Sequence, residues 1–414
     1  MTMNSTVYMR RFAGVALTVL LFVLAGCDTA APERNALVAA AGQRAPVVTN
    51  GCATGTQSSG ALYELCAPAG ALAGTLVVYA HGYVLPQLPL AIPAAEAGLP
   101  SVKAFVLGQG HGYAATSFHA NGLVEPQRGV HDLRELVQLY TKAFGRPERV
   151  VLFGVSNGAN LALLALEQNK GLYDGAFASC GPVGDFERQL GYFGDVFAAF
   201  DYFFPNVVPG GPDGISEAYL AALQQQSAAS GVPARLILAG ALQATLTAPA
   251  NFPKTLQLLS VLANTPRIDA DFNGPFEGIS TVIQAVVYNV FATNNALGVL
   301  GGQFYENADV RYVGSADDAA LNAGIQRYEA DAQALAQVRA HYQTKGKVAD
   351  PVVTLHNLRD PLVPFWQEAL YGAKLGDDAG LRTLTPVNRF GHCNFTPAEI
   401  EAALDALVAT TANV

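Results

Sequence analysis

Short apolar runs alternate with amphipathic segments along the chain from Leu62 onward. The apolar runs predict buried strands at 76–80, 113–117, 149–153, 176–179 and 352–355. Hydrophobic residues three to four positions apart predict helices over 128–144, 159–169 and 398–408. Parallel strands need crossover connections, so this repeated order of strand and helix predicts an α/β fold with a mostly parallel sheet covered by helices on both faces.

A serine stands in a glycine-rich turn between one of these strands and the next helix. The sequence GVSNG at 154–158 follows the predicted strand RVVLF and precedes the helical run ANLALLAL. Small residues beside Ser156 let the backbone turn sharply, which leaves the Oγ atom exposed. The order of strand, turn and helix indicates a nucleophile elbow. The alternative is a glycine-rich turn that carries a structural serine.

A nucleophilic serine requires a base and an orienting carboxylate further along the chain. Outside a long segment predicted to be helical, the histidines that follow Ser156 are His356 and His392. His356 ends the predicted strand VVTLH, whereas His392 lies in a loop just before the last helix, which makes His392 the candidate base. Asp360 follows that strand, with a proline that fixes the turn. Asp350 precedes the strand and would lie at the opposite edge of the sheet, so the candidate acid is Asp360.

The order serine, aspartate and histidine in these contexts resembles that of the secreted serine hydrolases of the α/β-hydrolase fold. The resemblance covers about residues 62–184 and 346–414. It implies a mostly parallel sheet flanked by helices and an acyl-enzyme mechanism. In that family the amide after the nucleophile, here Asn157, and an amide after an early strand, here Tyr83, form the oxyanion hole. The loop reads HGY at 81–83 where the family has an HGGG-type motif.

A long insertion separates the candidate nucleophile from the candidate acid. About 200 residues lie between Ser156 and Asp360, far more than two strand-helix units of roughly 30 residues each require. Segment 185–345 is predicted to be mostly helical, and the resemblance implies a lid or cap over the active site at this point of the chain. Its apolar faces form either an acyl or aromatic pocket or only the core of the insertion. Segments 51–184 and 346–414 form the predicted catalytic core.

The composition excludes several classes of protein. With 51% hydrophobic and 14% charged residues, the chain is predicted to be globular with a large core rather than disordered. A net charge of −9 provides no basic surface for phosphates, so we expect no nucleic-acid partner. The stretch 269–274 resembles the start of a calcium loop, but Ser280 stands where a bidentate glutamate belongs. We therefore expect neither a metal nor a cofactor.

The first residues have the layout of an export signal. Two arginines precede an apolar run at 12–24, which is too short to span a membrane. The run ends in LAGC, which resembles the lipobox of bacterial lipoproteins. That resemblance implies a signal peptide at 1–26, a lipid on Cys27 and a flexible tether at 27–50. The expected location is the bacterial cell envelope, anchored to the membrane and facing the periplasm or exterior. An ordinary cleaved signal with a chance cysteine is the alternative.

The four remaining cysteines predict two disulfides, because exported proteins fold in an oxidising compartment. Four cysteines allow three pairings. Proximity in the sequence favours Cys52 with Cys66, which leaves Cys180 with Cys393. Cys180 ends the strand after the nucleophile helix and Cys393 adjoins the candidate base. Both are therefore expected at the sheet edge where the nucleophile lies.

These features together predict a lipid-anchored serine hydrolase that cleaves carboxylic esters, either small molecules or polymers, through an acyl-enzyme. A serine peptidase and an acyltransferase of the same fold are the nearest alternatives. From a different class, the chain could be a catalytically silent, surface-binding lipoprotein. The presence of all three triad residue types in the expected order argues against that alternative.

Overall fold

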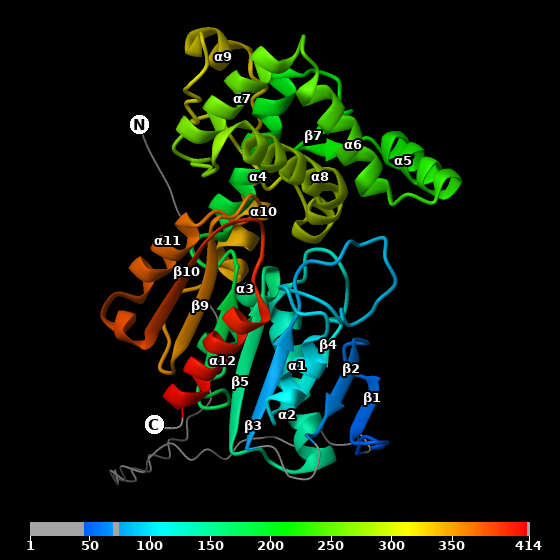
Figure 1. Ribbon diagram of the computed structural model, residues 1–414, viewed down its shortest axis with the longest axis vertical. Helices are drawn as coiled ribbons and strands as arrows, with labels where there is room; N and C mark the ends of the chain where they lie inside the picture. Colours follow the sequence, from blue (N-terminus) through cyan, green and yellow to red (C-terminus); the bar gives the residue numbers. More distant parts are fainter. Residues whose placement is uncertain (1–44, 69–73, 412–414) are drawn as a thin grey trace, which may run out of the picture. The chain divides into compact units, whose positions relative to one another are not determined.

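A central sheet organises the part of the chain that the structure describes. The structure is a computed structural model, and it describes residues 45–68 and 74–411. Eight strands of this part form the sheet in the order β1-β2-β4-β3-β5-β6-β9-β10 (Figure 1). Their bounds are β1 (Cys52–Thr56), β2 (Leu62–Cys66), β3 (Thr75–Ala80), β4 (Gly112–Thr116), β5 (Arg149–Val155), β6 (Gly175–Ser179), β9 (Val352–Arg359) and β10 (Arg382–Phe390). Neighbouring strands from β4 to β10 are parallel, and β1, β2 and β4 pair antiparallel. The predicted, mostly parallel sheet is confirmed.

Helices cover both faces of the sheet. One face carries α2 (Pro126–Phe144), α3 (Asn157–Gln168) and α11 (Trp366–Leu375), and the other carries α1 (Val102–Gly108) and α12 (Pro397–Thr411). Successive side chains of a strand point to opposite faces. Along β3, therefore, Val78 packs in the core on the α2 side and Val77 packs in the core on the α1 side. Apolar residues on both faces are typical of a parallel sheet between helical layers.

A helical insertion lies between β6 and β9. Its elements are α4 (Phe186–Phe203), β7 (Gly210–Gly211), β8 (Gly214–Ile215), α5 (Glu217–Ser230), α6 (Ala234–Thr247), α7 (Phe252–Asn264), α8 (Gly274–Leu300), α9 (Asp318–Gly324), α10 (Ala332–Gln337) and a π-helical turn (Val338–Tyr342). Figure 1 shows these elements gathered beyond one end of the sheet. The insertion has its own core, which includes buried aromatic residues of α4 such as Phe197 and Phe200, and α4 packs against α7 and α8.

The structure differs from the predicted elements near the last third of the chain. Strand β9 continues to Arg359, so His356 lies inside the strand rather than at its end. Strand β10 is not apparent from the sequence because, of its nine residues, only Val387 is buried. A strand at the edge of the sheet with so few buried residues lacks the alternation of apolar and polar residues from which a strand is predicted. A short 3₁₀ helix (Gly376–Leu381) precedes it.

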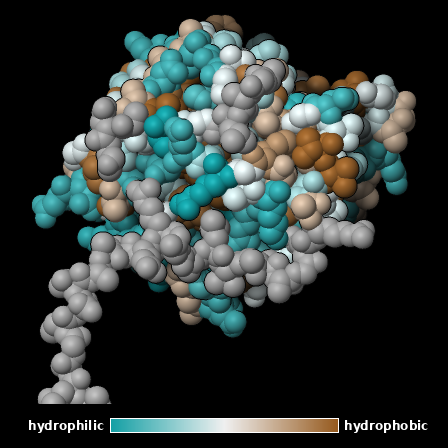
Figure 2. Space-filling view, turned by 90° about the horizontal axis from the view of Figure 1, so that it is seen from below, coloured by the Kyte–Doolittle hydropathy of each residue, from teal (hydrophilic) through white to brown (hydrophobic). Residues whose placement is uncertain are grey.

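The predicted signal peptide, Cys27 and most of the predicted tether lie outside the described residues. At the end of the tether segment, Thr49 pairs with Cys52 through two backbone hydrogen bonds of 2.7 and 3.0 Å. None of the helices within 45–68 and 74–411 combines the length and apolar character needed to cross a membrane. Seen from below, the visible surface is largely hydrophilic, with hydrophobic residues in small separate patches (Figure 2).

Candidate active site

Ser156 occupies a strained turn between β5 and α3. Its φ of 53° and ψ of −122° lie outside the region that a residue with a side chain normally adopts. Two glycines make the turn possible. A Cβ atom on Gly158 would lie 2.1 Å from the carbonyl oxygen of Ala80, and one on Gly154 would lie 2.5 Å from the Cα atom of Ala159. The close packing of the turn against β3 and α3 therefore requires glycine at both positions, as a nucleophile elbow does.

Three predicted residues from distant parts of the chain form one hydrogen-bonded series. His392 Nε2 lies 2.8 Å from Ser156 Oγ. His392 Nδ1 lies 2.8 Å from Asp360 Oδ2 and 3.1 Å from Oδ1. A carboxylate can only accept, so Nδ1 carries the proton and Nε2 is left to accept the Ser156 hydroxyl proton. The geometry is that of a nucleophile, a base and an orienting acid.

Asp360 is buried directly after β9, and backbone groups fix its carboxylate. Its Oδ1 atom accepts hydrogen bonds from the amides of Leu362 and Val363, each at 2.9 Å. His356 also lies near this carboxylate, with its Nε2 atom 3.7 Å from Asp360 Oδ2, but its hydrogen bonds go elsewhere. Its Nε2 lies 2.8 Å from the carbonyl oxygen of Val363 and its Nδ1 lies 2.9 Å from Glu368 Oε1. The structure thus brings His392 to the serine, while His356 belongs to a buried polar network.

The two amides predicted for the oxyanion hole lie on either side of the nucleophile. Asn157 is the first residue of α3, and Tyr83 lies in the loop after β3. Among the described residues, neither amide donates a hydrogen bond to a protein acceptor. The loop approaches the serine closely, because a Cβ atom on Gly82 would lie 3.1 Å from the Cβ atom of Ser156. Both amides are therefore available to a ligand at the serine.

Glu96 supports this loop, although the sequence analysis did not identify it. Its carboxylate accepts the Gly82 amide at 3.0 and 3.2 Å and the hydroxyl hydrogen bond of Tyr79. Burial raises the pKa of the Glu96 carboxyl from its ordinary value of 4.5 to about 7. One signal was present in the sequence. Glu96 is the only charged residue between His81 and Lys103, in a loop that is otherwise apolar or neutral.

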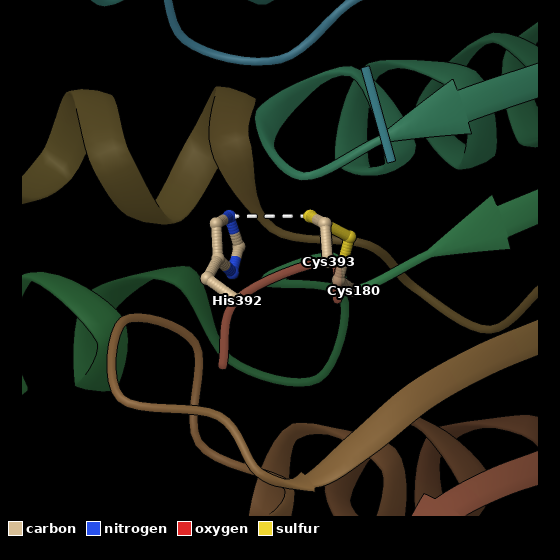
Figure 3. Close-up of side chains that lie close together, drawn as sticks. All are labelled: Cys180, His392 and Cys393. Atoms are coloured by element: carbon tan, nitrogen blue, oxygen red, sulfur yellow. Dashed lines mark hydrogen bonds between the residues drawn. A yellow bond between two sulfur atoms is a disulfide. The ribbon is translucent and has the colours of Figure 1, made fainter. Parts of the chain in front are cut away.

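Both predicted disulfides are present, Cys52–Cys66 and Cys180–Cys393. Figure 3 shows Cys180 and Cys393 joined beside the imidazole of His392, with the Cys393 sulfur 3.4 Å from Nε2. The bond links the residue after β6 to the loop that carries the base. Because both sulfurs are bonded to each other, this cluster of two cysteines and a histidine offers no free thiolate to a metal ion.

Ser156 borders two cavities, and the side chains of Tyr83 and Tyr288 also border both of them. One cavity measures about 70 Å³ and lies under α4 and α8 of the insertion. The other measures about 730 Å³ and is bordered by the loop at 391–394. The hydroxyl of Tyr83 is buried without a hydrogen-bond partner among the described residues. Because residues of α4 and α8 line the first cavity, the insertion provides walls to the site in addition to making its own core.

The strand order and the positions of the site residues decide the fold. Ser156 follows β5, Asp360 follows β9 and His392 follows β10, and β9 and β10 are the last two strands of the sheet. The chain has the α/β-hydrolase fold. Its triad order of serine, aspartate and histidine is the order found on this fold, and the fold class predicted from the sequence is confirmed.

Comparisons with known proteins returned structures of this fold. No protein-family model and no curated protein sequence matches the chain. An esterase from Pyrococcus furiosus is similar over 86% of this chain and 88% of that chain, with 12% identity and a TM-score of 0.43. Feruloyl esterase B from Aspergillus oryzae is similar over 83% and 74%, with 14% identity and a TM-score of 0.48. An acylaminoacyl peptidase from Pyrococcus horikoshii is similar over 84% and 38%, with 12% identity and a TM-score of 0.36.

Proposed function

We propose that the chain is a serine hydrolase that cleaves carboxylic esters through an acyl-enzyme. The observation that carries this proposal is the hydrogen-bonded series from Asp360 through His392 to Ser156, at 2.8 Å for each of its two closest contacts. The strained turn at Ser156 and the two free amides support it, because they supply the nucleophile and the oxyanion donors in one place. Strained backbone of this kind is concentrated at functional sites.

In acylation, Ser156 Oγ attacks the ester carbonyl carbon and its proton passes to His392 Nε2. Asp360 stabilises the imidazolium that forms. The amides of Asn157 and Tyr83 donate to the carbonyl oxygen as it becomes negative, and one such donor is worth roughly 3 kcal/mol in the transition state. The imidazolium then gives its proton to the departing alkoxide, and the alcohol leaves. Water, activated by His392, hydrolyses the acyl-enzyme in the reverse sense and releases the acid.

A peptidase and an acyltransferase would use the same acyl-enzyme and differ in the leaving group or in the acceptor. A panel of p-nitrophenyl esters and aminoacyl p-nitroanilides, with and without an added alcohol, distinguishes the three. We expect ester hydrolysis to exceed anilide hydrolysis, with free acid as the main product. Faster anilide cleavage would make the chain a peptidase, and a dominant transesterified product would make it an acyltransferase.

A fluorophosphonate probe separates the enzyme from a silent binding protein. The probe should label Ser156 in the wild-type chain and should not label Ser156→Ala, and the site is identified by mass spectrometry of the labelled peptide. Gly240→Ala, in α6 with open space around it, serves as a control that retains the nucleophile and both cavities. Failure to label a folded wild-type chain would contradict the proposed function.

We also propose that the chain acts while anchored in a bacterial cell envelope by a lipid on Cys27. The lipobox-like LAGC sequence supports the anchor. The two disulfides support an oxidising compartment, because structural disulfides are rare in the cytosol.

A further inference from the structure

The nucleophile lies at the junction of two cavities that differ mainly in size. Five residues border both cavities, namely Tyr83, Ser156, Tyr288, Leu362 and His392. The ring centroids of Tyr83 and Tyr288 are 5.0 Å apart, so these rings form a partition beside the serine. An ester bound at Ser156 must therefore place its acyl part on one side of this partition and its alcohol part on the other.

The small cavity is mostly apolar, and the insertion supplies much of its wall. Its walls include Phe186 and Phe193 of α4, Ala292 and Ala296 of α8, and Phe304. The Phe193 ring stacks on the Tyr288 ring with centroids 4.4 Å apart, which fixes one wall. Two polar wall residues, Gln189 and Asn289, have their side-chain amides bonded to the protein. Gln189 donates to the Leu362 carbonyl at 2.7 Å, and Asn289 donates to the Phe193 carbonyl at 2.9 Å.

The volume of this cavity limits what it can hold. About 70 Å³ is roughly half of the ~150 Å³ apolar cavity that accepts one benzene ring. An aliphatic chain of about two to four carbons fits such a space, and a longer chain or an aromatic acyl group does not. The protein interior is densely packed, so a longer chain would have to displace buried side chains.

The large cavity is mostly apolar as well, and it is much larger. Its volume is about 730 Å³, and its border includes the polar groups of Glu96, Arg235, Gln284 and Asn394. It is also bordered by Gly391 and Cys393, which flank the base. A bulky group with polar substituents can be accommodated here.

The position of the base assigns the two halves of the substrate. The leaving alkoxide must face His392 Nε2 to receive its proton, and the loop around His392 borders the large cavity. The small cavity instead includes Asn157, whose amide faces the carbonyl side of the substrate. The alcohol part therefore belongs in the large cavity, and the acyl part belongs in the small one.

We propose that the substrates of this site are esters of short aliphatic acids, of about two to four carbons, with bulkier alcohols. This inference rests on the proposed hydrolase function and specifies its substrate class. The small cavity selects for acyl chain length, and the large cavity tolerates variation in the alcohol.

The first test is a chain-length series on the wild-type protein, from p-nitrophenyl acetate through butyrate and hexanoate to octanoate. We expect kcat/KM to be highest at acetate or butyrate and at least about tenfold lower at octanoate, since one methylene that does not fit costs that much. Faster turnover of octanoate than of butyrate would overturn the inference and leave the hydrolase intact. Absence of turnover on every ester, together with an unlabelled Ser156, would instead reject the proposed function and the inference with it.

A matched pair of variants tests the assignment of the two cavities. Phe304 borders the small cavity and Phe291 borders the large one, and both are buried aromatic residues of the insertion. Phe304→Ala should raise the ratio of octanoate to butyrate turnover by about tenfold or more. Phe291→Ala should leave that ratio unchanged and alter the preference between methyl and naphthyl butyrate. The reverse pattern would overturn the assignment. The wild-type series still tests the inference if either variant fails to fold.

Discussion

Gly82 donates its backbone N–H to the Glu96 carboxylate at 3.0 Å, across 14 residues of chain. The same carboxylate accepts the Tyr79 hydroxyl, so it joins β3 to the loop that follows β3. The next amide of this loop is that of Tyr83, one of the two proposed oxyanion donors. Glu96 is thus a positioning residue, because it holds the backbone that approaches Ser156.

The raised pKa of Glu96 makes a prediction about stability. The folded value of about 7 exceeds the ordinary value of 4.5. The protonated Glu96 carboxyl therefore stabilises the fold fully below about pH 4.5, and this stabilisation is lost as the pH rises through about 7 and the carboxyl ionises. Glu96→Gln is neutral at every pH, so its Tm should rise relative to wild type between about pH 5 and about pH 8. Thermal melts across this range measure the difference, and a constant difference would contradict the assigned shift.

Removal of any triad member should abolish turnover while the fold survives. Ser156→Ala and His392→Ala should each lose about six orders of magnitude in kcat, because such residues act as a unit. Asp360→Asn should lose about four, since the amide favours the wrong imidazole tautomer. Circular dichroism verifies the fold of each variant.

Asp350→Asn is the matched control for the acid, because Asp350 precedes β9 and Asp360 follows it. It should keep wild-type kcat. A large loss of kcat in Asp350→Asn, together with an active Asp360→Asn, would mean that Asp350 and not Asp360 is the acid.

The elbow should not tolerate a methyl group at Gly158. A Cβ atom there would lie 2.1 Å from the Ala80 carbonyl oxygen. That oxygen belongs to the backbone, so the clash can be relieved only by a shift of the main chain. We expect Gly158→Ala to lower the Tm and to reduce kcat by at least about a hundredfold, because a shift of about 1 Å in the nucleophile has that cost. Gly240→Ala is the control. It lies on the exposed surface of α6 with open space around it, and should stabilise the helix by about 0.5–1 kcal/mol.

The two disulfides should differ in what their loss changes. Cys180–Cys393 holds the loop that carries the base, so Cys393→Ser should lower kcat more than it raises KM. Cys52–Cys66 joins the first two strands of the sheet, away from the serine. Cys52→Ser should mainly lower the Tm. Steady-state kinetics and thermal melts of the two variants, made under the same oxidising conditions, measure the contrast. Equal kinetic losses would argue that the first bond has no particular role in positioning the base.

The proposed lipid anchor predicts that Cys27→Ser is released from the membrane with its kcat unchanged. Fractionation of the producing cells and an esterase assay of the soluble fraction measure both parts. A variant that stays with the membrane would mean that another feature anchors the chain.

The sequence alone was sufficient for the features that depend on neighbouring residues. The elbow at Ser156 is one contiguous run of strand, turn and helix, and each part has its own local pattern. The core strands could be predicted because both faces of a parallel sheet are buried, so each strand is a short run of apolar residues. The pairing of Cys180 with Cys393 followed from the proximity of the other two cysteines, and from the position of Cys393 beside a base that must reach the sheet edge where Cys180 lies.

Tertiary structure decided what depends on packing between distant segments. Strand β10 is defined by its pairing with β9 and not by buried side chains, so its sequence has no alternation. The contact of Glu96 with Gly82 depends on how a loop without periodicity folds back. The size of the cavity at Ser156 depends on where α4 and α8 of the insertion come to lie above the sheet edge. A linear pattern records which residues are apolar, whereas the space left between them is determined only when the helices pack.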